Sequence, residues 1–391
     1  MKKNIIIKEN ISNNFYDKKL QKKNKSFLLK ILSQIEKDIN KKKNIFHLLS
    51  KKYFFNFKKS DLKKFKKFKS IVIIGMGGSI LGSKAIYSFL ENRIKKEVIF
   101  LDNLDGYKLK KILHNKNLRK KLFIIISKSG NTLETLTNIS FLGKKCFSSS
   151  NTILITENKN SSLKIFSKDM KIPIIEHKKY IVGRYSVLSE VGMVPAYLMG
   201  LNVNKFRKNL LKFFKKNNKQ LLCDSASKIS QNYLSKKISS IIFLNYCPKL
   251  NNLVYWCQQL MAESLGKKGK GILPVLSTAP KDHHSLLQLY LDGPKDKMFY
   301  IISGKSMYDK KINKKLSKII FSQRDAFIEV LNKKKISYRE IYINDFTESS
   351  IGEIFSYFML ETIMISKLIN VNPFNQPAVE EVKNLTKKFL N

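Results

Sequence analysis

The chain has 391 residues, of which 43% are hydrophobic, and a formal net charge of +46. This length suits two domains of ordinary size, and the apolar content is enough for a sizeable core. Such a charge is typical of nucleic-acid binding, but the lysines are spread from end to end without zinc-finger spacing or an aromatic RNA-binding stripe. Because Lys, Asn and Ile codons are rich in A and T, a biased genome accounts for the charge. We expect no specific nucleic-acid partner.

Neither a membrane span nor an oxidising compartment is indicated. The longest apolar stretches, 71–90 and 187–203, are interrupted by Lys84, Glu190 and Pro195, which argues against a transmembrane helix. The four cysteines form no C-x-x-C pair, and the apolar run near the N-terminus is too short for a signal peptide. We therefore expect a reduced, cytoplasmic protein.

Residues 1–60 place apolar side chains such as Leu28, Ile31 and Ile35 at helical spacing and predict a helical segment that leans on the first domain. Beyond it, short β-branched runs alternate with helical segments. The expected order is a strand, a glycine-rich turn and a helix within 70–90, then strands at 97–102, 122–127, 151–156 and 170–175. Strands that alternate with helices predict a doubly wound, mostly parallel sheet.

A second cycle of the same kind follows. Helices are expected at 203–216, 254–265, 314–333, 350–368 and 379–390, with strands at 238–246, 298–302 and 337–343. The fold class is therefore α/β, with two doubly wound parallel sheets flanked by helices. We divide the chain into an N-terminal helical segment (1–60), a first domain (61–205), a second domain (206–368) and a C-terminal helical arm (369–391).

The stretch 122–135, LFIIISKSGNTLET, predicts a buried strand that leads into a capped helix. Its β-branched start is typical of a parallel strand covered on both faces. Asn131, with Glu134 three residues later, predicts the cap. Free N–H groups at a helix start attract anions, and hydroxyl side chains gather around this one, namely Ser127, Ser129, Thr132 and Thr135. An ordinary strand–helix turn and a phosphate-binding loop both fit this stretch alone.

A glycine-rich turn, GMGGS at 75–79, also follows a predicted strand and opens a helix. A dinucleotide-binding turn needs a third glycine where Ile80 stands, although Asp102 ends the next strand where a ribose-binding acid would lie. Alternatively, Gly77 and Gly78 let the backbone approach a sugar phosphate, and the Ser79 hydroxyl is a further ligand. Because both turns follow parallel strands, we expect them at the same edge of one sheet.

Further side chains are candidates for acid–base chemistry or charge stabilisation. Arg184 precedes an apolar helix, and arginine is rare in this lysine-rich chain, so it suits a fixed cation for developing negative charge. Glu263, near the end of an apolar helix, suits a general base. His283 and His284 precede another apolar helix. The plain alternatives are a surface arginine, a solvated glutamate and structural histidines, and no H-x-x-x-H or Cys/His cluster supports a metal.

Together these motifs resemble the glucose-6-phosphate isomerase (phosphoglucose isomerase) family in its short bacterial form, from about residue 70 to the C-terminus. The motifs that carry the resemblance are GMGGSILG at 75–82, SKSGNTLET at 127–135, VGRYSVLSEVGMVP at 182–195, QLMAESLGK at 259–267, DHHSLLQLYLDG at 282–293 and NPFNQPAVEEVK at 372–383.

The resemblance implies two sugar-isomerase (SIS) domains, an active site between them in a homodimer, and interconversion of glucose 6-phosphate and fructose 6-phosphate without a metal or nucleotide. By the same resemblance Glu263 moves the proton between C2 and C1, and Arg184 stabilises the enediolate. His284, supplied by the neighbouring subunit, opens the sugar ring beside Lys383. The implied substrate-binding residues are Gly78, Ser79, Ser127, Lys128, Ser129, Thr132 and Thr135.

Two other functions stay open. The SGNT form of the phosphate loop also occurs in relatives that act on both glucose and mannose phosphates, so a dual phosphoglucose/phosphomannose isomerase is one alternative. SIS domains also occur in non-catalytic sugar-phosphate sensors. A sensor needs only the phosphate loop, so the joint presence of Glu263, His284 and Lys383 argues against it.

Overall fold

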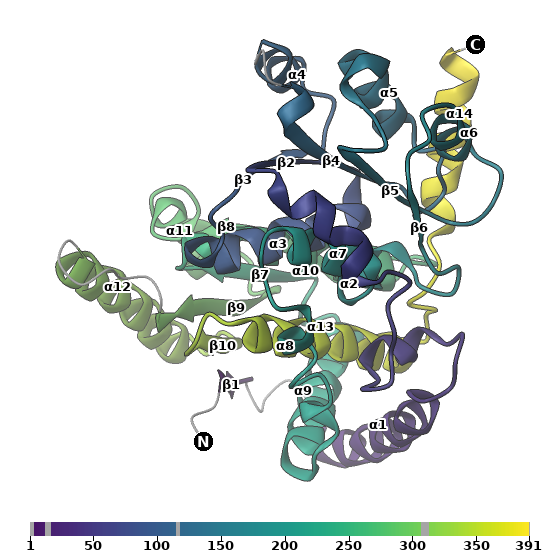
Figure 1. The fold of residues 1–391 in the computed structure, drawn as a ribbon. Coiled ribbons are helices and arrows are strands. Elements are labelled where there is room, and N and C mark those ends of the chain that lie inside the picture. The colour runs from purple at the N-terminus through teal and green to yellow at the C-terminus, as the bar shows by residue number, and fades with distance from the viewer. Residues whose placement is uncertain (1–3, 12–16, 115–117, 306–312, 391) are drawn as a thin grey trace. The chain divides into compact units, whose positions relative to one another are not determined.

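The computed structural model contains two sheets, and helices cover both faces of each sheet (Figure 1). It describes residues 4–11, 17–114, 118–305 and 313–390. The chain divides into two units. Unit 1 comprises residues 1–36, 212–345 and 356–391, and unit 2 comprises residues 37–211 and 346–355. The expected fold class of two doubly wound α/β domains is confirmed, whereas the expected domain boundaries stay a prediction.

The sheet of unit 2 has five parallel strands in the order β3-β2-β4-β5-β6. Their bounds are β2 Ser70–Ile74, β3 Glu97–Leu101, β4 Lys121–Ile126, β5 Thr152–Thr156 and β6 Ile174–Glu176. The strand order reverses between β2 and β4, and a crevice for ligands forms at the carboxyl ends of strands where the order reverses. The glycine-rich turn follows β2 and the phosphate loop follows β4, so their expected position at one sheet edge is confirmed.

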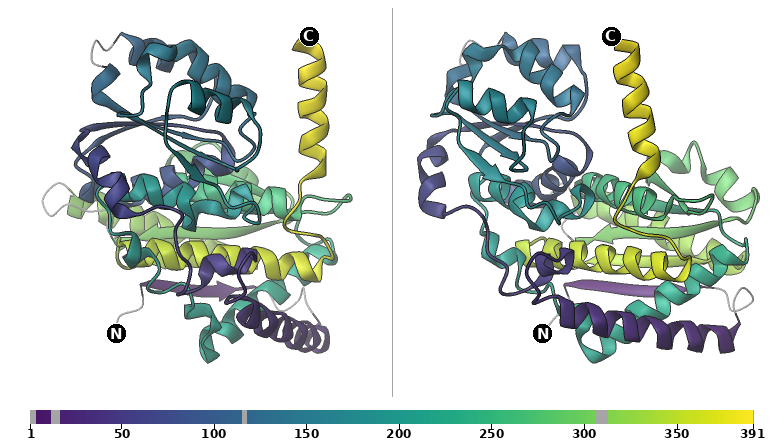
Figure 2. Two further views of the ribbon diagram at one scale, coloured as in Figure 1. Left: turned by 45° about the vertical axis from the view of Figure 1, so that its right-hand side comes forward. Right: turned by 90° about the vertical axis from the view of Figure 1, so that its right-hand side faces the viewer.

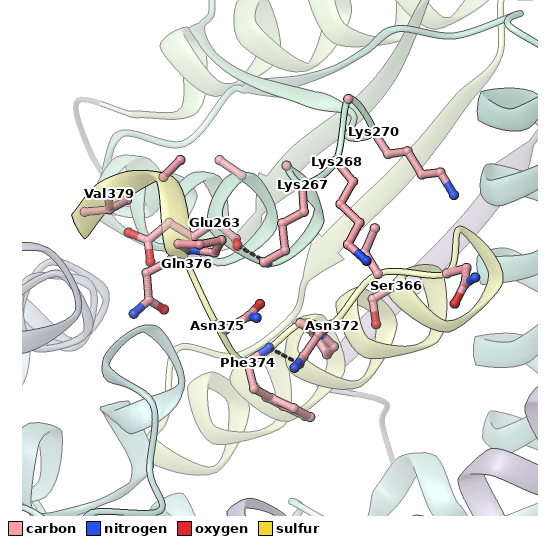
Figure 3. A pocket seen from close by; sticks show the side chains of 18 of the residues that line it. Glu263, Lys267, Lys268, Lys270, Ser366, Asn372, Phe374, Asn375, Gln376 and Val379 are labelled. Carbon is pink, nitrogen blue, oxygen red and sulfur yellow. Dashed lines mark hydrogen bonds between the residues drawn. The ribbon is translucent and has the colours of Figure 1, made fainter. Parts of the chain in front are cut away.

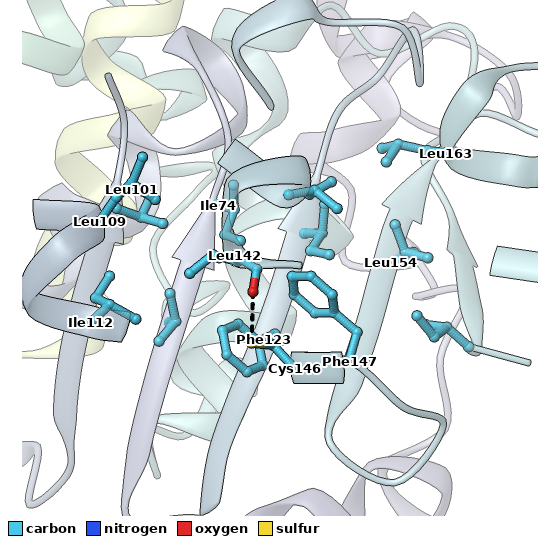
Figure 4. Close-up of a cluster of buried hydrophobic side chains, with 14 residues drawn as sticks. Ile74, Leu101, Leu109, Ile112, Phe123, Leu142, Cys146, Phe147, Leu154 and Leu163 are labelled. Atoms are coloured by element: carbon cyan, nitrogen blue, oxygen red, sulfur yellow. Dashed lines mark hydrogen bonds between the residues drawn. The ribbon is translucent and has the colours of Figure 1, made fainter. Parts of the chain in front are cut away.

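Helices cover both faces of this sheet because its strands are apolar on both faces. The helices of unit 2 are α2 Lys59–Lys63, α3 Leu81–Leu90, α4 Gly106–Leu113, α5 Leu133–Leu142, α6 Ser162–Asp169, α7 Glu190–Leu198 and α8 Val203–Phe206. On one face, Leu109 of α4 and Leu142 of α5 join Ile74 and Phe123 in a buried cluster (Figure 4). Helices α3 and α7 lie on the other face (Figure 1).

The sheet of unit 1 has the order β1-β10-β9-β7-β8, with β1 antiparallel and the other strands parallel. Its strands are β1 Ile5–Asn10, β7 Ser240–Asn245, β8 Leu273–Thr278, β9 Lys297–Gly304 and β10 Tyr338–Ile343. Here the strand order reverses between β7 and β9. By this rule the topology predicts a crevice of the same kind in unit 1, at the carboxyl ends of β7 and β9.

The helices of unit 1 are α1 Lys18–Asp38, α9 Lys216–Leu234, α10 Asn251–Leu265, α11 Leu287–Asp292, α12 Asn313–Lys333, α13 Glu348–Leu368 and α14 Pro377–Leu390, of which α1 and α13 continue into unit 2. Phe327 of α12 and Tyr290 of α11 pack on one sheet face, and Phe358 of α13 contacts Phe243 on the other. Helix α14, the last helix of the chain, has no buried residue and projects as a separate helix (Figure 2).

The structure differs from the sequence expectations in several elements. The N-terminal segment is not wholly helical, because three successive isoleucines start β1 and Arg339 of β10 donates Nη2 to Glu9 at 2.9 Å. The expected helix at 203–216 is wrong, since α8 ends at Phe206 and α9 begins only at Lys216. Strand β8 was not expected because it contains Pro274, which is tolerated here because β8 is an edge strand. In the described ranges, no helix is long and apolar enough to cross a bilayer.

Candidate active site

In unit 2, the glycine-rich turn packs directly against the segment that carries Arg184. A Cβ atom on Gly78 would lie 2.3–2.6 Å from the carbonyl of Gly183 and the nitrogen of Arg184. Ser186 donates its hydroxyl to the Gly183 carbonyl at 2.7 Å and reaches the Gly78 carbonyl at 3.4 Å. Glycine is therefore required at 78 for the close approach of two backbone segments.

Arg184 belongs to a 3-10 helix, Gly183–Leu188, that precedes α7. Its side chain is only 2% exposed, and its guanidinium lies 5.6 Å from the ring of Tyr185. The plain alternative of a surface arginine is therefore wrong. A buried guanidinium held by a short helix is a cation of fixed position.

The phosphate loop gathers three hydroxyl groups at the start of α5. Ser127 Oγ lies 2.8 Å from Thr132 Oγ1 and accepts a hydrogen bond from the Gly130 nitrogen at 3.1 Å. Ser129 Oγ lies 3.4 Å from the same Thr132 oxygen. Gly130 has φ +69°, and a Cβ there would meet Ser161 Oγ at 2.2 Å. The loop thus presents clustered hydroxyls beside a helix N-terminus, an arrangement that suits a phosphate group.

The cap of α5 differs from the expectation. Thr132, and not Asn131, is the N-cap residue, and its side chain makes no capping hydrogen bond. Asn131 Oδ1 instead accepts from the Ser162 nitrogen at 2.8 Å, which ties the loop to the start of α6. Thr135 is buried within α5, and its Oγ1 has no hydrogen-bond partner among the described residues.

The ammonium group of Lys128 contacts residues that follow β5 and β6. Its ammonium donates to the Lys179 carbonyl at 3.1 Å and lies 3.5 Å from a carboxylate oxygen of Glu157. Burial lowers the pKa of Lys128, and the neighbouring Glu157 opposes this shift. Its expected role in substrate binding therefore stays a prediction.

The structure argues against Asp102 as the ribose-binding acid of a dinucleotide site. Asp102 accepts a hydrogen bond from Lys84 Nζ of α3 at 2.5 Å, and Lys108 Nζ lies 3.4 Å away. Burial disfavours the carboxylate, but these two ammonium groups outweigh it and lower the pKa of Asp102. A carboxylate already paired with Lys84 is not displayed for a ribose.

In unit 1, Glu263 lies in the last turn of α10 and lines a cavity of about 1100 Å³ (Figure 3). The cavity walls come from the end of α10, the turn after it and the segment 370–379, which leads into α14. Gln259, one turn earlier on the same helix face, donates Nε2 to a Glu263 carboxylate oxygen at 2.8 Å. The glutamate is partly buried and hydrogen-bonded, so it is not the solvated residue of the plain alternative.

Lys267 fixes the end of the helix that carries Glu263. Its ammonium donates to the backbone carbonyls of Glu263 and Ser264 at 2.5 and 2.8 Å, where a cation also complements the helix dipole. Paired hydrogen bonds between Lys267 and Lys270 close a tight turn, with positive φ at Lys268 and Gly269. A braced turn therefore follows the glutamate directly.

His284 and Lys383 are both exposed in unit 1. His284 follows the 3-10 helix Lys281–His283 and does not line the cavity of Glu263. Lys383 shares a face of α14 with Val379, which does line that cavity, and its ammonium lies 2.8 Å from Glu380. The structure therefore leaves both side chains accessible.

Comparison with known proteins decides the family. The chain matches the family described as "Phosphoglucose isomerase" over residues 34–276. It is 33% identical to glucose-6-phosphate isomerase of Methanocaldococcus jannaschii over 344 residues, or 81% of this chain and 83% of that protein. The chain belongs to the phosphoglucose isomerase family.

Other relatives agree with this assignment. Glucose-6-phosphate isomerase of Campylobacter jejuni is 30% identical over 357 residues, or 83% of this chain and 86% of that protein. The crystal structure of a glucose-6-phosphate isomerase from Chlamydia trachomatis superposes with a TM-score of 0.81 at 17% identity, covering 99% of this chain and 88% of that chain. The resemblance inferred from the motifs is confirmed.

Within this phosphoglucose isomerase fold, the candidate residues form two groups. Unit 2 holds the hydroxyl loop, the glycine-rich turn and Arg184, while unit 1 holds Glu263, His284 and Lys383. Sequence reasoning missed Gln259, which hydrogen-bonds to Glu263, and Gln376, which lines the cavity. The i, i+4 spacing of Gln259 and Glu263 was the available signal, but glutamine carries no charge that draws attention to it.

Proposed function

We propose that this protein interconverts D-glucose 6-phosphate and D-fructose 6-phosphate through a cis-enediol intermediate. Family membership is the observation that carries this proposal. Such an enzyme serves glycolysis and gluconeogenesis. We therefore propose that it acts in the cytoplasm.

The sugar phosphate is held by its phosphate group in unit 2. The hydroxyls of Ser127, Ser129 and Thr132 and the N-terminus of α5 bind the phosphate, with Ser79 of the glycine-rich turn as a further donor. This contact is remote from the reacting carbons, so its binding energy can orient them. Arg184, buried and cationic, stabilises the negative charge of the enediolate.

Glu263 acts as the base on the open-chain sugar. It removes the proton from C2 and returns it to C1, and one carboxylate serves both carbons because the cis-enediol presents them on one face. Gln259 donates Nε2 to one carboxylate oxygen of Glu263 and so orients the carboxylate. The buried Gln259 Oε1, which has no partner among the described residues, can accept from a sugar hydroxyl.

Ring opening precedes this step. His284 protonates the ring oxygen as the C1 hydroxyl loses its proton, with Lys383 beside it. The exposure of both side chains suits a site completed by a second copy of the chain. We therefore propose a homodimer in which each copy supplies His284 to its neighbour.

A coupled assay tests the proposal. Purified protein is given fructose 6-phosphate and an indicator enzyme that oxidises glucose 6-phosphate, with Glu263→Gln run beside the wild type. We expect the variant to lose kcat by several orders of magnitude, because an amide cannot accept the proton, while it still binds sugar phosphate. The control, Glu91→Gln on an exposed turn, keeps full activity. A fully active Glu263→Gln would contradict the assignment.

The same assay separates the alternatives. Mannose 6-phosphate replaces fructose 6-phosphate to test the dual phosphoglucose/phosphomannose isomerase, and family membership alone does not favour that wider activity. A wild type that binds sugar phosphate without turnover would indicate the non-catalytic sensor.

A further inference from the structure

The second crevice of the fold, at the carboxyl ends of β7 and β9 in unit 1, contains side chains that the proposed chemistry does not use. Tyr246 follows β7 directly, and its backbone nitrogen still bonds to Ile302 of β9 at 2.8 Å. Its side chain is fully buried. Its hydroxyl lies 2.8 Å from Nε2 of His283.

His283 is the immediate neighbour of His284, and its ring turns inward. It meets the ring of Tyr246 edge-on at 5.5 Å and the ring of Phe327 at 5.9 Å. Burial lowers the pKa of His283 and so favours the neutral imidazole, which shares a hydrogen bond with the Tyr246 hydroxyl through Nε2. Tyr246 belongs to the buried cluster of unit 1 that also contains Tyr290, Phe327 and Tyr338, so it anchors one histidine of the pair in this cluster.

A second anchor holds the same loop. Asp282 accepts hydrogen bonds from Ser277 Oγ at 2.8 Å and from the Thr278 nitrogen at 2.7 Å, both at the end of β8. Its backbone carbonyl accepts from Leu286 at 2.8 Å, which closes the turn around the histidines. With its two preceding side chains fixed, His284 is left exposed on the outer side of the turn.

We propose that Tyr246 and His283 are positioning residues that hold His284 in place for ring opening. This inference rests on the proposed function, because His284 has a task only if the substrate is a closed sugar ring. The crevice of unit 1 then serves as the support of a catalytic histidine, while the crevice of unit 2 binds the phosphate.

The substitution Tyr246→Phe tests the inference, because it removes one hydroxyl and keeps the ring packing. Loss of one neutral hydrogen bond is expected to lower kcat roughly three- to tenfold. Ring opening becomes slower while proton transfer by Glu263 is unchanged. The deuterium isotope effect on kcat with glucose 6-phosphate labelled at C2 therefore falls towards one.

Two further measurements complete the experiment. Tyr338→Phe is the matched control, since Tyr338 lies in the same buried cluster and its hydroxyl bonds to Asn332 at 3.0 Å, away from the histidine turn. It should keep the wild-type kcat and isotope effect. Arabinonate 5-phosphate, an open-chain sugar acid that needs no ring opening, should inhibit Tyr246→Phe and the wild type with equal constants.

A Tyr246→Phe enzyme with wild-type kcat would overturn the inference, as would a slower enzyme whose isotope effect is unchanged or larger. If Tyr246→Phe does not fold, two variants of His283 replace it. His283→Gln should behave as the wild type, because an amide group can still hydrogen-bond to Tyr246. His283→Leu cannot form this bond and should show the lower kcat and the smaller isotope effect. A wild type that turns over neither hexose phosphate would fail the proposed function and this inference together, whereas the outcomes above fail the inference only.

Discussion

The two sheets share one strand order and use its crevice in opposite ways. In both units the first parallel strand lies between the second and the third, namely β2 between β3 and β4, and β7 between β8 and β9. In unit 2 the strands at this point lead into glycines and short hydroxyl side chains such as Ser127 and Thr132. In unit 1 the large side chain of Tyr246 follows the equivalent strand, β7, and its hydroxyl lies 2.8 Å from Nε2 of His283 in the loop after β8.

Side-chain size explains the difference. Glycine and serine are small, so an anion can approach the hydroxyl groups of the loop and the start of α5. At the end of β9, Arg324 donates Nη1 to Ser303 Oγ at 3.1 Å, and after β7 the side chain of Tyr246 is fully buried. Glu263 lies instead near the far end of α10, about 18 Å along the helix from its first residue. Topology therefore supplies the crevice, and the residues placed in it decide whether it binds a ligand or supports a loop.

Gly78→Ala should break the unit 2 crevice most severely. The added methyl would lie within 2.6 Å of the Gly183 carbonyl and the Arg184 nitrogen, so one of two backbone segments must move. We expect the displacement of Arg184 to lower kcat/KM by roughly 100-fold or more, as for lost electrostatic stabilisation of a transition state.

The control for this prediction is Gly106→Ala, where the methyl meets nothing within 4 Å. Its kcat/KM, measured in the coupled assay, should equal that of the wild type. A Gly78→Ala enzyme of normal activity would show that the contact with the Arg184 segment is not needed for catalysis.

We expect His177 to make unit 2 less stable at acidic pH. It is buried beside the phosphate loop, and burial together with the charge of Lys128 lowers its pKa to about 4, which Glu157 partly opposes. Below pH 6.5 this histidine binds a proton in the unfolded chain but not in the folded protein. Its contribution to the free energy of unfolding is therefore fully present above pH 6.5. The free energy of unfolding should fall by roughly 2 kcal/mol between pH 7 and pH 5.

Chemical denaturation at a series of pH values measures this dependence. His177→Gln should flatten the curve by that amount, while His114→Gln on the surface should follow the wild type. Equal slopes for all three proteins would remove His177 as the cause.

The sequence predicted the parts of the fold that depend on local composition. Each parallel strand of unit 2 is a β-branched run, and the loops after 70–74 and 121–126 were expected at one edge because parallel strands share a direction. Helix α9 escaped prediction because its sequence, KNNKQLLCDSASKISQNYL, is rich in Ser and Asn and is amphipathic only weakly. Strand β8 escaped because Pro274 argues against a strand unless its edge position is known.

Tertiary contacts limited the prediction of the site in the same way. Asn131 had the sequence of a helix cap, but the nitrogen of Ser162, 31 residues away, takes its side chain. Gly78 was expected to approach a phosphate, and the structure adds a requirement that no local pattern shows, its contact with Gly183. Lys267 could not be distinguished from the other lysines by composition, although its distance of four residues from Glu263 suits a C-terminal cap.

Lys267→Met tests whether Glu263 depends on the lysine that fixes the end of its helix. We expect a smaller effect on activity than for the changes above. Methionine keeps the length of the side chain but leaves the carbonyls of Glu263 and Ser264 without the ammonium. We expect kcat to fall roughly fivefold with little change in KM, because a loosened helix end misplaces the base without touching the phosphate site. Proton transfer then limits turnover, so the isotope effect at C2 should rise, opposite to the fall expected for Tyr246→Phe. Lys267→Arg should restore most of the rate, and Lys268→Met, in the same cavity but without this cap, should behave as the wild type. If Lys267→Met lowered the isotope effect instead, the turn after α10 would support ring opening rather than the base, and the two supports of unit 1 would not be separate.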